Sequence, residues 1–174
     1  MKKYYAIAIV AAFMLIAGKA NAQVSVHAGY QHPIMSDGFF SLKYNGFYVG
    51  GSYNIHVANN IGVAPGACLT YASFTYYGDK DTEIDLRIPI LANYGIDVNR
   101  DLRLFGFAGP MAGINLLSDA GVKRFDLGVM FGAGARYQKI SAEIGYNIGV
   151  LNRNDDEDYK VTMNHFFVGL GYSF

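Results

Sequence analysis

Apolar and polar side chains alternate along most of the chain after Gln23, with a period of two residues. This period is typical of β-strands, because successive side chains of a strand point to opposite faces of the sheet. Between Ile84 and Ile96, for example, every even-numbered residue is apolar, whereas the odd-numbered residues include Asp85 and Arg87. The pattern predicts eight strands, at residues 24–31, 44–57, 61–77, 83–96, 102–114, 124–137, 140–151 and 161–174.

Tight turns and longer connections join the predicted strands alternately. The tight turns are residues 58–60, 97–101 and 138–139, and the longer connections are 32–43, 78–82, 115–123 and 152–160. Short turns at one end and longer loops at the other are typical of transmembrane β-barrels, whose strands need about 9–11 residues to cross the bilayer. We therefore predict an all-β fold, an eight-stranded antiparallel up-and-down transmembrane β-barrel over residues 23–174.

The alternative is a soluble barrel such as a lipocalin, in which the apolar face would point inward. The opposite face would then be a solvated surface rich in charged residues. Instead, that face carries small residues such as Gly128, Gly132 and Gly134, together with the large apolar side chains of Phe105 and Phe107. Such residues suit the crowded lumen of an eight-stranded barrel, so we predict that the apolar face contacts lipid.

The first 22 residues have the features of a secretory signal peptide. Lys2 and Lys3 precede an apolar stretch at residues 4–18, and residues 20–22 (Ala-Asn-Ala) offer a small-x-small cleavage site. The stretch is shorter than the roughly 20 residues that a membrane-spanning helix needs. We predict that residues 1–22 are cleaved and that residues 23–174 reach the outer membrane of a Gram-negative bacterium.

Composition narrows the function classes. Charged residues make up 16% of the chain and aromatic residues 15%, whereas a soluble domain is typically about one quarter charged. Without Lys2, Lys3 and Lys19 of the predicted signal, 11 basic residues face 14 acidic ones. The sequence has no basic stripe for nucleic acid, and Cys68 is the only cysteine, so no internal disulfide can form. Histidines and cysteines lack metal-ligand spacing, so no cofactor is predicted.

Aromatic residues are predicted to gather where the barrel meets the two bilayer interfaces. The band near the tight turns comprises Tyr53, Tyr94, Tyr137, Tyr172 and Phe174. The band near the longer loops comprises Tyr44, Phe47, Tyr71, Tyr76 and Tyr77. Two such bands are expected of a barrel that is anchored in a bilayer.

The last predicted strand ends in an alternating run of outward-facing residues, namely Phe166, Val168, Leu170, Tyr172 and Phe174. This run resembles the C-terminal signal by which outer-membrane barrels are recognised for assembly. With the signal peptide and the Gly- and Tyr-rich strands, the chain resembles the small outer-membrane β-barrel family, of the OmpA-barrel, OmpX-like and PorT-like kind. The resemblance implies fold and location rather than an activity. It also implies the barrel-assembly machinery, outer-membrane lipids and lipopolysaccharide as partners, and we expect a monomer.

Six charged residues are predicted to face the lumen: Asp85, Arg87, Arg103, Asp126, Arg136 and Glu143. Arg103, Arg136 and Glu143 are expected near the tight turns, where Arg136 would lie diagonal to Glu143. The other three are expected toward the longer loops. Because buried charges are costly unless paired, we predict a salt-bridged plug and a structural or surface-interaction role for the long loops. The alternative is a narrow gated pore or transport accessory.

A lipid-modifying enzyme is the third possibility. Such an enzyme would need a histidine and a serine near the outer rim of the barrel. His32, Ser36 and Asp37 form the one grouping of suitable types there, whereas His27 lies near the tight turns and His165 is predicted to face inward. Loops collect such residues by chance, so we predict no catalytic activity.

Overall fold

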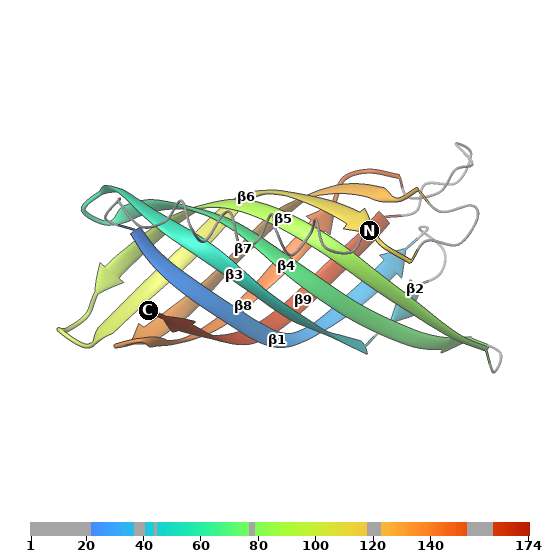
Figure 1. Cartoon of the computed structure of the whole chain (residues 1–174), viewed down its shortest axis with the longest axis horizontal. Helices are drawn as coiled ribbons and strands as arrows, with labels where there is room; N and C mark the ends of the chain where they lie inside the picture. The colour runs from blue at the N-terminus through green and yellow to red at the C-terminus, as the bar shows by residue number, and fades with distance from the viewer. Residues whose placement is uncertain (1–21, 37–40, 44, 77–78, 118–122, 153–161) are drawn as a thin grey trace, which may run out of the picture.

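A computed structural model of the chain shows a closed barrel of antiparallel strands (Figure 1). It describes residues 22–36, 41–43, 45–76, 79–117, 123–152 and 162–174. The strands are β1 (Ala22–Ser36), β2 (Ser41–Lys43), β3 (Asn45–Ala58), β4 (Ile61–Tyr76), β5 (Asp79–Asp97), β6 (Leu102–Asn115), β7 (Phe125–Tyr137), β8 (Ile140–Gly149) and β9 (Thr162–Ser173). No helix that could span a bilayer occurs in these residues. The predicted signal peptide, residues 1–22, lies outside the described residues except for Ala22.

The barrel has eight strands, because β2 and β3 are two parts of one of them. Ile34 of β1 lies opposite Lys43 of β2. Three residues earlier in β1, Gln31 lies opposite Gly46 of β3, so β2 continues the register of β3. Each further strand pairs with the next along the chain, and β1 pairs with β9 to close the sheet. The predicted fold class is confirmed.

The strands are inclined to the barrel axis, as Figure 1 shows. Following the paired residues once around the barrel from Ala22 leads to His32, ten residues further along β1. The path runs through Ile55, Val63, Ala92, Ala108, Phe131, Tyr146 and Phe166. Eight tilted strands enclose a lumen just wide enough for side chains to fill. Which residues meet across the lumen therefore depends on this stagger.

The apolar face of the sheet points outward, as the alternation predicts. Val49, Ile144 and Leu170 retain 59%, 50% and 64% of their surface, whereas polar residues of the opposite parity are buried. In a soluble protein this exposed apolar surface would be unfavourable, and in a bilayer it contacts lipid. The inward-pointing alternative, a lipocalin-like carrier, does not fit this arrangement.

Six of the predicted strands agree with the structure to within two residues, and two are longer than predicted. β1 and β5 extend into the predicted connections 32–43 and 78–82, which are therefore partly strand. Pro33 lacks the N–H that a ladder hydrogen bond needs. β1 nevertheless continues through Pro33, because His32 and Ile34 on either side of it pair with β9.

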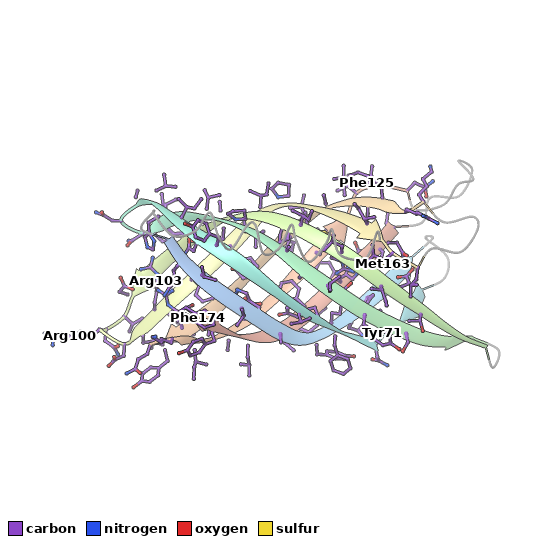
Figure 2. The ribbon with its side chains drawn as sticks, in the orientation of Figure 1. Tyr71, Arg100, Arg103, Phe125, Met163 and Phe174 are labelled. Atoms are coloured by element: carbon purple, nitrogen blue, oxygen red, sulfur yellow. The ribbon has the colours of Figure 1, made fainter. Side chains whose placement is uncertain are left out.

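The tight turns and the C-terminus lie together at one end of the barrel, on the left of Figure 1. The hairpin of residues 138–139 forms as predicted, with Gln138 at φ 53° and Arg136 opposite Ser141. Exposed aromatic side chains lie near this end and, in a second group, further toward the longer connections. Figure 2 shows Phe174 in the first group and Tyr71 in the second. The side chains of Tyr44, Tyr76 and Tyr77 lie outside the described residues.

Candidate functional site in the barrel lumen

A layer of buried polar side chains crosses the lumen in the half nearer the longer connections. Arg87 of β5 is its centre: one Nη2 contact reaches Asp85 Oδ2 at 2.9 Å and another reaches His165 Nε2 at 2.6 Å. Arg87 Nη1 donates to Gln31 Oε1 at 3.0 Å. Asn147 completes the layer, since its side-chain amide lies 3.3 Å from His165 Nδ1. We call these five residues, Gln31, Asp85, Arg87, Asn147 and His165, the plug layer.

The side chains of the plug layer are buried and close the lumen at this level. Arg87 retains 5% of its surface and His165 retains 1%. Because an arginine N–H can only donate, His165 Nε2 accepts from Arg87, and the imidazole is neutral in this arrangement. Met111 and Met163, both almost fully buried, occupy the same part of the lumen, and Figure 2 shows Met163 in the half away from the tight turns.

Asp126 of β7 faces the same half of the lumen and is buried. It lies opposite Gly113 of β6, the residue that also pairs with Arg87 of β5. A Cβ added to Gly113 would come 3.5 Å from Asp126 Cβ and 3.8 Å from Arg87 Cγ. The structure thus places the three residues predicted for this end, Asp85, Arg87 and Asp126, around one point of the lumen.

The three charged residues predicted for the tight-turn end do not form one cluster. Arg103 pairs with Asp97 at the exposed rim, with Nη1 to Oδ1 at 3.0 Å. Arg136 lies directly opposite Arg103 in the strand register but donates to Gln23. Within the described part of the chain, Arg136 forms no ion pair with Glu143, so the diagonal contact that the strand order suggests is not made.

Glu143 instead meets two residues from the other side of the barrel. The Tyr48 hydroxyl of β3 donates to Glu143 Oε1 at 2.9 Å. His27 Nδ1 of β1 lies 3.4 Å from Glu143 Oε2, although its N–H is not aligned for a hydrogen bond. On the far side of the imidazole, His27 Nε2 lies 2.9 Å from Ser52 Oγ of β3. The side chains of Ser52, His27 and Glu143 thus lie in a row, with His27 between the other two.

Two glycines of β9 make room for this arrangement. A Cβ added to Gly171 would come 2.9 Å from His27 Nδ1, and a Cβ added to Gly169 would collide with the Tyr48 hydroxyl. Sequence reasoning did not connect His27 with Ser52 and Tyr48, because the three residues share no motif and His27 lies on β1 whereas Ser52 and Tyr48 lie on β3. The small inward residues at the end of β9 are the one sequence signal that could have indicated a space there.

A cavity of about 180 Å³ lies in front of these side chains. Its wall includes His27, Tyr48, Ser52, Phe105, Phe107 and Glu143. Arg87 and His165 of the plug layer line one end of it, and Arg103 and Arg136 line the other. The side chain of His27 retains 22% of its surface, whereas the Arg87 and Asp85 side chains of the plug layer retain 6% and 9%. We call this space the lumen chamber.

The remaining candidates from the sequence lie elsewhere. The predicted assembly residues Phe166, Val168, Leu170, Tyr172 and Phe174 all point outward and are exposed. Of the outer-rim group, His32 Nδ1 lies 3.4 Å from the Tyr30 hydroxyl, while Asp37 and the side chain of Ser36 lie outside the described residues. Over the described ranges, no group of histidine, cysteine and acidic side chains could hold a metal ion.

Comparison with known proteins identifies the family. Residues 6–174 match the model of the outer membrane protein β-barrel domain. The chain belongs to this family. Membership confirms the family resemblance of the sequence and implies a location in the bacterial outer membrane. No curated protein matches the chain.

Solved structures of small outer-membrane barrels are similar to this one. Neisserial surface protein A is 17% identical with a TM-score of 0.58, over 88% of this chain and 99% of that one. Ail, the attachment invasion locus protein of Yersinia pestis, is 20% identical with a TM-score of 0.52, over 88% and 99%. The outer membrane enzyme PagL is 11% identical with a TM-score of 0.57, over 86% and 98%. At these identities the likeness shows the shared fold alone.

Proposed function

We propose that this protein is a closed, non-conducting outer-membrane barrel with a structural or surface-interaction role. The observation that carries the proposal is the plug layer, in which Arg87 joins side chains from β1, β5 and β9 across the lumen. The long connections of the barrel are then the parts available to a partner. A barrel that served as a pore would need a continuous polar path instead.

The plug is costly to open. Moving Arg87 away would remove the hydrogen bonds that it makes to Gln31, Asp85 and His165, whose side chains are buried. Removing one member of a buried ion pair costs about 3–5 kcal/mol. The plug layer therefore favours one closed arrangement over a set of rearranging pairs.

Orientation and partners follow from the architecture. Short turns of such barrels face the periplasm, so the tight turns and Phe174 would lie inside and the longer connections outside. The exposed apolar belt and its aromatic bands suit outer-membrane lipids and lipopolysaccharide. We further propose that the outward run ending in Phe174 is read by the barrel-assembly machinery, that residues 1–22 are removed, and that the barrel acts as a monomer.

Single-channel recording tests the proposed closure. Folded protein, verified by a mobility shift between boiled and unboiled samples of the outer-membrane fraction, is placed in a planar bilayer. We expect no steady unitary current from the parent and measurable current from Arg87→Ala, because the plug layer loses its centre. Arg103→Ala, at the rim, is the matched control and should stay silent. Steady current in the parent would favour the pore instead.

The proposed assembly signal is tested on the same gel, where Phe174→Ala should show less folded protein than the parent.

A further inference from the structure

We propose that Ser52, His27 and Glu143 form a hydrolytic centre that cleaves small esters inside the lumen chamber. Three strands, β3, β1 and β8, bring these residues into series. A nucleophile, a base within hydrogen-bond reach and a third group beside the base are the geometric signature of nucleophilic catalysis. The proposal adds an activity to the closed barrel and does not depend on the role of its loops.

The carboxylate of Glu143 favours one tautomer of His27. Glu143 Oε2 lies next to His27 Nδ1, which favours the tautomer with its proton on Nδ1. Nε2 is then an acceptor, so the Ser52 hydroxyl donates to it across 2.9 Å. This is the arrangement in which histidine can take the proton of an attacking serine. The Nδ1 contact is long, as such contacts often are in enzymes without substrate.

The position of Glu143 is itself held. Tyr48 donates to its second oxygen, Oε1, and Gly169 and Gly171 leave the space that Tyr48 and His27 occupy. Glu143 and Tyr48 are therefore positioning residues, whereas Ser52 and His27 are the residues that would touch the reacting atoms. A side chain on either glycine would displace one of these groups.

The chamber decides the class of substrate. Its volume of about 180 Å³ admits only a small molecule, and Phe105 and Phe107 give it an apolar wall. The plug layer closes one end, so a substrate enters from the tight-turn end, past Arg103 and Arg136. Asn54 lies two residues beyond Ser52 on the inward face of β3, and its Oδ1 accepts from Asn93. Asn54 also lines the chamber, and in this proposal its side-chain amide is the donor for the negative charge that develops on the ester oxygen.

The reaction needs only water as a second reactant. Ser52 Oγ attacks the ester carbonyl carbon while its proton passes to His27 Nε2. His27 then gives this proton to the leaving alkoxide, the alcohol departs, and the acyl group stays on Ser52. Water attacks the acyl group, its proton passes through His27 to Ser52, and the carboxylic acid leaves.

Covalent labelling tests the centre directly. Folded protein in detergent is treated with diisopropyl fluorophosphate, and the labelled peptide is found by mass spectrometry, alongside hydrolysis of p-nitrophenyl acetate. We expect one label on Ser52, and no label in Ser52→Ala. In His27→Gln, labelling and hydrolysis should fall on the order of 10²–10⁴-fold. Ser25→Ala is the matched control, since Ser25 is a lumen serine that bonds to Ser173 instead, and it should be labelled normally.

Two variants of Glu143 test whether this residue positions His27 for the reaction or only stabilises the fold. Glu143→Gln should lower kcat with KM unchanged, and Glu143→Asp should restore part of the loss. Every variant is first shown to fold by its mobility shift on the gel. If the folded parent carries no label on Ser52 and hydrolyses the ester no faster than Ser52→Ala, the three residues are a hydrogen-bond network only and the proposal is overturned.

Discussion

Each half of the lumen contains one histidine, and the two histidines differ in their burial and in the charge of their neighbour. In the plug layer, His165 is buried and accepts a hydrogen bond from Arg87. In the lumen chamber, His27 lies between Ser52 and the carboxylate of Glu143, and part of its ring is accessible. A cation beside the first imidazole keeps its Nε2 occupied, whereas an anion beside the second leaves Nε2 facing a hydroxyl. The neighbouring charged residue, rather than the histidine itself, therefore decides what Nε2 of each ring contacts.

The sizes of the inward side chains explain why the half of the lumen with the plug layer is filled, whereas the other half contains the lumen chamber. The inward positions of β9 are Met163, His165 and Phe167 in the half nearer the longer connections, followed by Gly169 and Gly171. In a barrel this narrow, each large inward residue removes space that its neighbours could use. The change from large to absent side chains along β9 coincides with the change from the plug layer to the lumen chamber.

The largest expected change in stability comes from breaking the buried ion pair of Arg87, compared with the exposed ion pair of Arg103. Arg87→Ala should lower the free energy of unfolding in detergent micelles by about 3–5 kcal/mol, because Asp85 is left buried without its cation. Arg103→Ala removes a pair whose partner, Asp97, is 61% exposed, and should cost no more than about 1 kcal/mol. Urea titration followed by tyrosine fluorescence measures both. Equal losses in the two variants would contradict the difference between the two halves.

A smaller effect is expected from filling the space behind His27. Gly171→Ala places a Cβ 2.5 Å from Ser141 Oγ and 2.9 Å from His27 Nδ1, so we expect a loss of about 1–3 kcal/mol from overpacking and, because His27 must move, loss of the Ser52 label. In the control Gly106→Ala, the new Cβ meets nothing closer than 3.7 Å, and both stability and labelling should be unchanged. A Gly171→Ala protein that labels normally would show that the chamber does not hold His27 in place.

The sequence predicts the parity of the lumen residues well and their partners poorly. Alternation with a period of two is a local property, so Asp85 and Arg87 could be assigned to the lumen and Leu170 to lipid from the chain alone. Contacts across the lumen depend on the ten-residue stagger, which Gly-rich strands specify weakly. For this reason Glu143 could be expected to meet Arg136 from hairpin geometry, while its actual partners come from across the barrel.

Accessibility of single thiols in the two halves tests the central claim, that the lumen is sealed in one half and open in the other. Ser52→Cys and Met163→Cys are each made in a Cys68→Ser background and treated, as folded protein, with a small methanethiosulfonate reagent. Ser52 lines the lumen chamber, whereas Met163 is fully buried and does not line it, so we expect modification of the Ser52→Cys protein and none of the Met163→Cys protein until it is unfolded. Equal reactivity of the two folded proteins would contradict the claim.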